Sequence, residues 1–428
     1  MLDVVEDGAV RDHLVVMRRM PDELCLATLV SRGAAVDAHL RAIARAVAAF
    51  HARAATSDEI ATAATADAVR ANWVANIAGA ERFTGGLLDA DLERRIERRA
   101  LRYLDGRAPL FERRIAEGRV RDGHGDLLAA DIFCLPDGPR ILDCIEFDDR
   151  LRHGDVLADV AFLAMDLERL GRPDLARRFL THYREFSAET HPASLAHHYI
   201  AYRAHVRAKV ACLRHEQGDA AAAAEASRLL RIAFTHAERA RVTLTLVGGL
   251  PGTGKSTLGA RLSEALGSVH LRSDVVRREL RGLPATGSPA GFAEGMYAPA
   301  VTARTYRELL RRAERLLRLG ESVVLDATWT DPRWRARAAR IATSTSSDLV
   351  QLECRAPLEV AEGRIEARRT KARDVSEATA DVARTMASRC RRWPSAVAVD
   401  TTRDRSEELV TALRAVARSA PEHAGAAG

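Results

Sequence analysis

The sequence predicts an α/β protein in two parts, a mostly helical first part followed by a parallel-sheet α/β/α domain. Its 428 residues are too many for one ordinary hydrophobic core and suit two or three domains. Helical spacing of apolar residues dominates up to about residue 238, whereas short β-rich runs alternate with helical segments from residue 241 onward. We therefore predict domains at residues 1–238 and 239–419 and a disordered tail at 420–428.

The composition argues against several classes of protein. No run approaches eighteen apolar residues, and the opening MLDVVEDGAVRDH lacks the basic and apolar segments of a signal peptide, so we expect a cytoplasmic protein without a membrane partner. The net charge of +6 is small for this length and its charges are interleaved, so no specific nucleic-acid partner is expected. Six isolated cysteines are expected to be reduced thiols rather than zinc ligands. Nothing in the composition indicates an oligomeric state.

In the first part, helical periodicity is interrupted by β-rich runs. A strand-like run at 13–17 precedes a helical region that covers about 40–118. Residues 131–135 and 140–147 are β-rich and flank a Pro-Asp-Gly turn, which predicts a β-hairpin. Helical patterns return over about 155–238, including an alanine-rich connector.

In the second part, five short β-rich runs are separated by helical segments. They lie at residues 242–247, 268–271, 322–328, 348–354 and 396–400. This alternation is typical of a parallel sheet with helices on both faces.

The strongest motif of the chain is GLPGTGKS, which matches the phosphate-binding loop G-x-x-x-x-G-K-[ST] between a predicted strand and a predicted helix. Its glycines let backbone N–H groups turn toward a bound anion at a helix N-terminus. Lys255, one of three lysines in the chain, is expected to reach the β- and γ-phosphates, and the Ser256 hydroxyl to ligate Mg²⁺. The residues expected to bind the nucleotide are Gly249, Leu250, Pro251, Gly252, Thr253, Gly254, Lys255, Ser256 and Thr257.

Two aspartates follow predicted strands of the same sheet. Asp326 ends the apolar run SVVLD, a position from which a carboxylate meets the Mg²⁺ shell; the alternative is a cap for the next segment. Asp274 follows the strand at 268–271, at the sheet edge where ligands gather in doubly wound folds. It is our candidate base for a substrate hydroxyl, and its alternative role is a helix N-cap.

Arginines on the predicted helix after 348–354 form a candidate lid. Arg364 and Arg368 are i, i+4 neighbours that could close over the phosphates and stabilise the transferred charge. In so arginine-rich a chain, a solvated helix face explains them equally well.

Residues of about 241–418 resemble the small P-loop kinases of the zeta-toxin, gluconate-kinase and chloramphenicol-phosphotransferase type. The resemblance rests on GLPGTGKS, the Ser-Asp pair after the second strand, LDATW and the arginine-bearing helix. It implies ATP and Mg²⁺ as cofactors and transfer of the γ-phosphate onto a small hydroxylated substrate.

The segment HGDLLAAD and the hairpin after it place carboxylates in the order that kinase-like phosphoryl transfer uses. With ILDCIEF and GDVLAD they resemble the C-lobe of the aminoglycoside phosphotransferase fold, and the whole chain resembles bacterial bifunctional aminoglycoside phosphotransferase/ATP-binding proteins. The resemblance implies Asp126 as base, Asp131 as a metal ligand and Asp143 or Glu146 as the second. It also implies structural roles for two further aspartates, Asp155 and Asp159.

This half departs from the family pattern in two ways. Residue 131 is Asp where the family usually has Asn, and no lysine precedes Lys209, so most of an N-lobe is missing. Either the gene start is misplaced or the half binds without phosphorylating, which we favour. The alternative for the whole protein is an ATP-hydrolysing regulatory module in which the N-terminal half serves as sensor or scaffold. A polynucleotide kinase is a third hypothesis, which a steep salt dependence of nucleic-acid binding would support.

Overall fold

A computed structural model describes residues 2–7, 9–14, 16, 19–282, 298–369, 384, 386 and 392–419 of the chain. Among the helices of this part, none is long and apolar enough to cross a membrane. The predicted tail at 420–428 lies outside the described residues.

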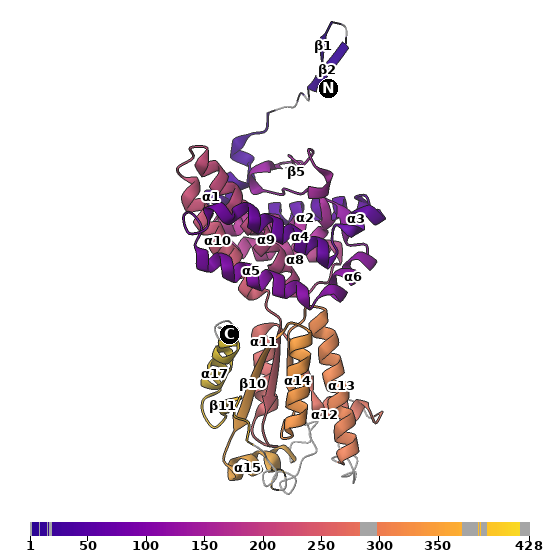
Figure 1. Ribbon diagram of the computed structural model, residues 1–428, viewed down its shortest axis with the longest axis vertical. Helices are drawn as coiled ribbons and strands as arrows, with labels where there is room; N and C mark the ends of the chain where they lie inside the picture. Colours follow the sequence, from indigo (N-terminus) through magenta and orange to yellow (C-terminus); the bar gives the residue numbers. More distant parts are fainter. Residues whose placement is uncertain are drawn as a thin grey trace. The chain divides into compact units, whose positions relative to one another are not determined.

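The chain forms two compact units, each assembled from separate segments. Figure 1 shows the helices and strands coloured along the sequence. The first unit consists of Met1–Ala64, Gly118–Thr190 and Tyr199–Ala233. The second consists of Thr65–Glu117, His191–His198 and Phe234–Gly428. This grouping differs from a single boundary at 238/239, because part of the predicted helical region groups with the parallel sheet.

The first unit is mostly helical, with three two-stranded antiparallel sheets in its described part. Its strands are β1 (Leu2–Glu6), β2 (Ala9–Leu14), β3 (Val120–Asp122), β4 (Ile132–Leu135), β5 (Gly138–Ile141) and β6 (His153–Asp155). Its helices are α1 (Leu26–Ser31), α2 (Asp37–Arg53), α3 (Asp58–Thr62), α7 (Val156–Arg169) and α8 (Pro173–Ser187). Helices α9 (Ala193–Glu216) and α10 (Ala222–Arg239) contribute to both units.

Two of the predicted strands in this unit need correction. The run predicted at 13–17 belongs to β2, which ends at Leu14, and part of the remainder lies outside the described residues. The hairpin at 131–147 is present as β4 and β5, but its second strand ends at Ile141. The residues after Ile141 leave the ladder, and Asp143 there adopts a left-handed backbone with φ 63°.

The second unit contains the predicted parallel sheet, and all five of its strands are confirmed. The order is β11-β10-β7-β9-β8, and every neighbouring pair is parallel. The strands are β7 (Thr243–Gly248), β8 (Val269–Arg272), β9 (Val323–Asp326), β10 (Asp348–Arg355) and β11 (Val397–Asp400). The helices are α4 (Ala66–Ala80), α5 (Ala90–Asp105), α6 (Ala108–Ala116), α11 (Lys255–Leu266), α12 (Ser273–Glu279), α13 (Pro299–Arg318), α14 (Pro332–Ser344), α15 (Leu358–Arg369) and α17 (Arg405–Arg418).

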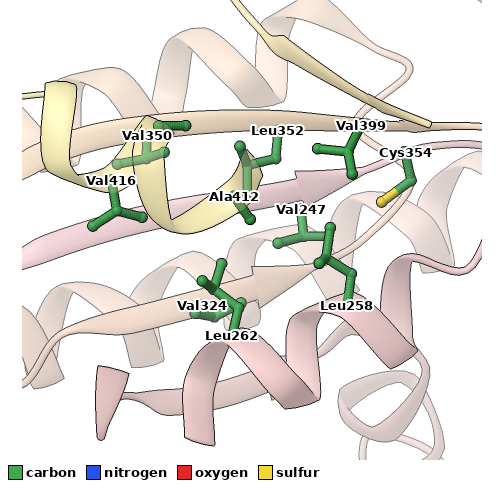
Figure 2. Packing of buried hydrophobic residues seen from close by; sticks show 11 residues of the cluster. Val247, Leu258, Leu262, Val324, Val350, Leu352, Cys354, Val399, Ala412 and Val416 are labelled. Carbon is green, nitrogen blue, oxygen red and sulfur yellow. The ribbon is translucent and has the colours of Figure 1, made fainter. Parts of the chain in front are cut away.

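A cluster of buried apolar residues packs α11 and α17 against the sheet (Figure 2). Leu258 and Leu262 come from α11 and Ala412 from α17, while Val247 comes from β7 and Leu352 from β10. Burying each of the larger side chains contributes about 1.5–3 kcal/mol. This packing holds in place the strand that enters the P-loop and the helix that leaves it.

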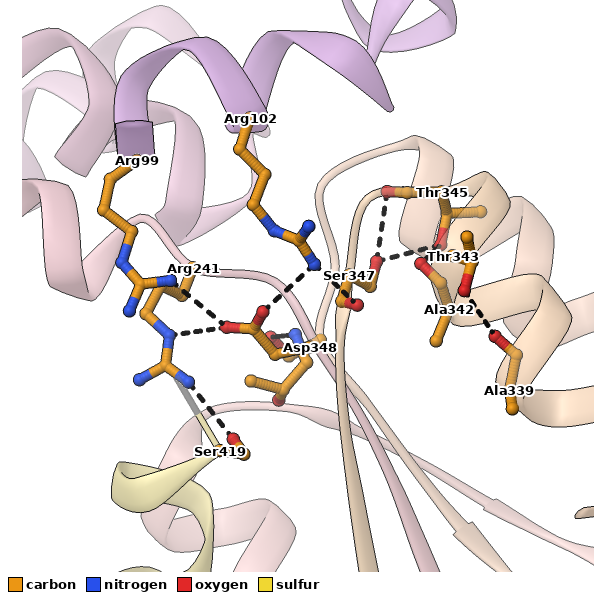
Figure 3. A network of polar contacts seen from close by, with 12 residues as sticks. Arg99, Arg102, Arg241, Ala339, Ala342, Thr343, Thr345, Ser347, Asp348 and Ser419 are labelled. Carbon is orange, nitrogen blue, oxygen red and sulfur yellow. Dashed lines mark hydrogen bonds and ion pairs between the residues drawn. The ribbon is translucent and has the colours of Figure 1, made fainter. Parts of the chain in front are cut away.

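A charged network lies at the amino end of the sheet (Figure 3). Asp348, the first residue of β10, is 4% exposed and is surrounded by three guanidinium groups. Arg241 Nε lies 2.6 Å and Arg102 Nη2 3.2 Å from its oxygens, and Arg99 Nη1 lies 3.8 Å away. Since Arg99 and Arg102 belong to α5, this helix is bonded to the sheet.

The turn between α5 and α6 also packs against the segment between α14 and β10. Arg107 is 1% exposed and donates to the Thr345 carbonyl oxygen at 2.6 Å, and burial lowers the pKa of its guanidinium to about 10. At Gly106, a Cβ atom would lie 2.1 Å from the same carbonyl oxygen. These contacts explain why Thr65–Glu117 groups with the sheet.

Candidate functional site

The P-loop connects β7 to α11 and adopts a backbone that requires glycine at three positions. Gly249, Gly252 and Gly254 have φ of 138°, 83° and 82°. A Cβ at Gly249 would lie 2.6 Å from the Cys354 carbonyl oxygen, and one at Gly252 would lie 2.3 Å from that of Ala361. The loop therefore packs directly against β10 and α15.

Lys255 is the first residue of α11, as the motif predicts. Gly254 occupies the N-cap position, and no side chain of the described structure caps this helix end. Uncapped N–H groups at a helix N-terminus favour a bound anion. The residues from Gly249 to Thr257 therefore form a cradle that suits a phosphate group.

Asp326 lies at the carboxyl end of β9, beside the strand that enters the P-loop. It is 3% exposed, and in the sheet register it is opposite Val247 of β7 and Arg272 of β8. Its Oδ2 lies 3.6 Å from Arg272 Nε and 4.0 Å from His270 Nε2, and its Oδ1 has no hydrogen-bond partner among the described residues. A buried carboxylate oxygen without a partner fits a metal ion or its water shell.

The capping alternative for Asp326 is wrong. The next helix, α14, is capped by Asp331, whose side chain accepts a hydrogen bond from the Arg333 N–H.

Asp274 is the second residue of α12, and its N-cap alternative is also wrong, because Arg272 occupies that position without a side-chain bond. Arg277, one turn further along, donates to Asp274 Oδ1 at 2.8 Å. The Asp274 side chain is 18% exposed and the Arg277 side chain is 8% exposed. Asp274 therefore lies at the carboxyl edge of the sheet, held by a buried guanidinium.

Tyr306 of α13 joins this region to the segment after β9. Its hydroxyl bonds with Thr328 Oγ1 at 3.1 Å and accepts from the Trp329 N–H at 3.1 Å. Burial raises the pKa of Tyr306. The Thr328 carbonyl in turn accepts from the Gly249 N–H at 3.3 Å. The segment 325–329 (LDATW) is therefore hydrogen-bonded both to the P-loop and to α13, the helix that packs on α12.

Arg364 of α15 is not on a solvated face. Its guanidinium donates to the carbonyl oxygen of Thr401 at 2.6 Å and to Thr401 Oγ1 at 3.3 Å. The Thr401 hydroxyl donates to the Thr253 carbonyl oxygen of the P-loop at 2.8 Å. Arg364 is therefore linked to the P-loop through Thr401, by two successive hydrogen bonds. The side chain of Arg368 lies outside the described residues.

In the first unit, three of the predicted carboxylates lie near one another. Burial raises the pKa of Asp126, and the nearby charge of Arg207 partly opposes this shift. Burial also raises the pKa of Asp131, and the negative charges of Asp143 and Asp126 raise it further. Glu146 is exposed in the segment after β5. Within the described part of the chain, no group of three or more His, Cys, Asp or Glu side chains is placed to hold a metal ion.

The structural roles expected of Asp155 and Asp159 are confirmed. Asp155 caps α7 by accepting from the Leu157 N–H at 2.9 Å. Asp159 accepts from the backbone N–H groups of His124 and Gly125 at 2.6 and 2.8 Å and pairs with His51 at 3.1 Å. Burial alone would raise the pKa of Asp159, but the bonds from His51 and the loop outweigh it and lower the pKa to about 2.

The sequence analysis missed three residues of the P-loop site: Arg277, Tyr306 and Thr401. Two of them had a usable signal. Arg277 stands three residues after Asp274 on a predicted helix, a spacing at which side chains meet. Thr401 follows a strand of the parallel sheet at its carboxyl end, where ligands gather. No local pattern indicates that Tyr306 bonds to Thr328.

Strand order, loop geometry and the residues at the sheet edge define a P-loop α/β domain in the second unit. A family model described as an AAA domain (AAA_33) matches residues 244–393. The chain is 45% identical over 403 residues to "Uncharacterized protein Rv2004c" of Mycobacterium tuberculosis and to "Uncharacterized protein Mb2027c" of Mycobacterium bovis. Each alignment covers 94% of this chain and 80% of the relative. The chain belongs to the family of these mycobacterial proteins.

Solved structures match the chain over about two fifths of its length. A gluconokinase from Sinorhizobium meliloti is 19% identical, covering 41% of this chain and 92% of its own, with a TM-score of 0.29. The Mycobacterium tuberculosis APS kinase CysC in complex with AMPPNP and APS is 21% identical, covering 41% and 98%, with a TM-score of 0.31.

Proposed function

We propose that the protein is an ATP-dependent phosphotransferase that moves the γ-phosphate of ATP onto a hydroxyl group of a small molecule. The observation that supports this proposal best is the placement of three groups at the carboxyl edge of the same sheet. These are the phosphate cradle at Lys255, the Asp326 carboxylate oxygen that has no partner among the described residues, and the Asp274 carboxylate beside Arg277. A phosphate site, a metal-binding carboxylate and a base for the acceptor are the parts that phosphoryl transfer needs.

The proposed roles follow from the positions of the residues. The backbone N–H groups at the start of α11 bind the phosphates, and Lys255 neutralises charge on the β- and γ-phosphates. Mg²⁺, when bound by Ser256 and Asp326, offsets the charge that develops on the phosphate oxygens. Asp274 accepts the proton of the substrate hydroxyl while the hydroxyl oxygen forms a bond to the γ-phosphorus. The bond from that phosphorus to the β–γ bridging oxygen breaks, and ADP leaves.

Arg364 and Arg368 are proposed to stabilise the transferred phosphate. Arg364 is bonded to Thr401, so its approach to the phosphates requires exchange of those two hydrogen bonds for bonds to phosphate oxygens. A charge-assisted bond to phosphate is stronger than one to a carbonyl, which favours the exchange once nucleotide is present.

The first unit is proposed to act without transferring phosphate. Its carboxylates Asp126, Asp131 and Asp143 are close together, but no set of three metal ligands is present among the described residues. We further propose a cytoplasmic protein whose partner is a small hydroxylated molecule and which binds neither membrane nor a specific nucleic acid.

The decisive experiment is turnover of γ-labelled ATP with a panel of small hydroxylated acceptors. It compares wild type with Lys255→Ala and with Asp126→Ala, and circular dichroism serves as the folding control. Loss of transfer in Lys255→Ala with full activity in Asp126→Ala supports the proposal. A substantial loss in Asp126→Ala shows that the first unit transfers phosphate as well. ATP hydrolysis without any labelled acceptor favours the regulatory module instead.

A further inference from the structure

A cavity of about 850 Å³ lies in the first unit, between the end of α2, the loop that contains His124 and the segment after β5. Its volume falls in the range of small-molecule sites, roughly 300–1,000 Å³. Half of its lining side chains are apolar: Val47, Phe50, Ala54, Ala55, Leu127, Ile141 and Leu142. Neither Asp126 nor Asp131 lines it, whereas Asp143, one of the two candidates for the second metal ligand, does.

Most charged groups of the lining already have partners. Arg152 donates to Asp122 at 2.9 and 3.3 Å and to the Ile145 carbonyl oxygen at 2.8 Å. Asp159 is bonded to His51 and to the backbone of the His124 loop. Arg152 and Asp122 compensate each other, whereas Asp159 keeps its negative charge.

Asp143 is the exception in this lining. It is exposed, and none of the cations in the described part of the chain pairs with it. Its backbone has φ 63°, a conformation that costs about 1 kcal/mol or more in a residue other than glycine. Phe50, which also lines the cavity, leaves 41% of its surface exposed. The cavity therefore offers one uncompensated carboxylate beside apolar surface.

We propose that this cavity binds a small organic cation with an apolar body. The ammonium or amidinium group pairs with Asp143, and the apolar body packs against Val47, Phe50 and Ile141. The negative charges of Asp143 and Asp159 disfavour an anion in the same place. This inference does not depend on the phosphotransferase activity proposed for the second unit.

The test uses three probes with the same ring system and different charge: 2-naphthylmethylamine, 2-naphthylmethanol and 2-naphthoate. Binding to the full-length chain is measured by isothermal titration calorimetry. We expect the amine to bind about fivefold more tightly than the alcohol, since an exposed ion pair contributes at most about that factor, and the naphthoate to bind most weakly. Asp143→Asn should abolish the preference for the amine while the alcohol binds as before, because Asn also tolerates the left-handed backbone. Glu59→Gln removes an exposed charge elsewhere in the unit and should retain the preference.

The position of the bound probe is tested separately through Cys144, an exposed thiol that lines the cavity. The amine should slow modification of Cys144 by N-ethylmaleimide, followed by mass spectrometry of its peptide. Ala54→Phe, which reduces the cavity volume, should weaken both the amine and the alcohol. Equal binding of amine and alcohol to the wild type, an unchanged preference in Asp143→Asn, or no protection of Cys144 would each overturn the proposal.

Discussion

The Arg241 guanidinium donates a 2.6 Å hydrogen bond to Asp348, which ties the segment before β7 to the first residue of β10. β7 leads into the P-loop, and β10 leads toward α15, which carries Arg364. The same carboxylate accepts a bond from Arg102 of α5. One buried aspartate therefore anchors, from the amino end of the sheet, the two strands that support the candidate site at its carboxyl end.

Asp348→Asn is expected to lower the free energy of unfolding by about 3 kcal/mol, because it leaves three neighbouring guanidinium groups without their shared carboxylate. Urea denaturation measures the change. Glu407→Gln is the matched control, since its 3.7 Å pair with Arg403 is exposed and should contribute less than about 1 kcal/mol. Equal effects of the two substitutions would show that Asp348 does not anchor the sheet.

Gly252→Ala is expected to destabilise the second unit by at least about 2 kcal/mol and to weaken binding of a fluorescent ATP analogue. The added Cβ would lie 2.3 Å from the Ala361 carbonyl oxygen, at a backbone φ of 83° that L-residues rarely adopt. Gly363→Ala, on α15 with no atom within 4 Å of the added Cβ, is the control. It should be neutral or stabilising by up to about 1 kcal/mol. Unchanged nucleotide affinity in Gly252→Ala would contradict this account of the loop.

The lowered pKa of Asp159 leads us to expect that the free energy of unfolding depends on pH. Its folded-state pKa of about 2 lies below the ordinary value of 3.8, so its contribution is complete above pH 5 and is lost as the pH falls from about 4 toward 2. The difference in unfolding free energy between wild type and Asp159→Asn should shrink by about 2 kcal/mol over that range. Chemical denaturation at a series of pH values measures it. Parallel curves for the two proteins would mean that Asp159 is not held as the buried anion.

Asp274→Asn is expected to lower turnover by about 10²- to 10⁴-fold while ATP binding is retained, because the amide cannot accept the substrate proton. The amide oxygen still accepts from Arg277, so the fold of α12 should be kept. Transfer of labelled phosphate and equilibrium nucleotide binding are measured side by side. Glu279→Gln, an exposed residue of the same helix, should behave as wild type. If Asp274→Asn retains full turnover, another group accepts the proton.

The structure excludes two alternatives that the sequence left open, and it shortens one predicted strand. Asp326 and Asp274 each had a plausible capping role, and only the neighbouring elements showed that Asp331 and Arg272 occupy those positions. The second strand of the hairpin was predicted too long, because its apolar residues continue beyond the point where pairing with β4 ends at Ile141.

The sequence by itself determined the parallel sheet, the P-loop, the aspartate after β8 and the aspartate that ends β9, because alternating periodicities and a contiguous loop motif are local properties of the chain. Only the tertiary structure decided that α5 belongs with the sheet, that Arg364 bonds to Thr401 and that Asp159 holds the His124 loop. Each of these depends on a polar side chain that finds a partner at least 35 residues away. An arginine-rich helix has the same local pattern whether it faces solvent or a buried carboxylate, and the free energy that separates the two cases comes from desolvation and pairing in the folded protein.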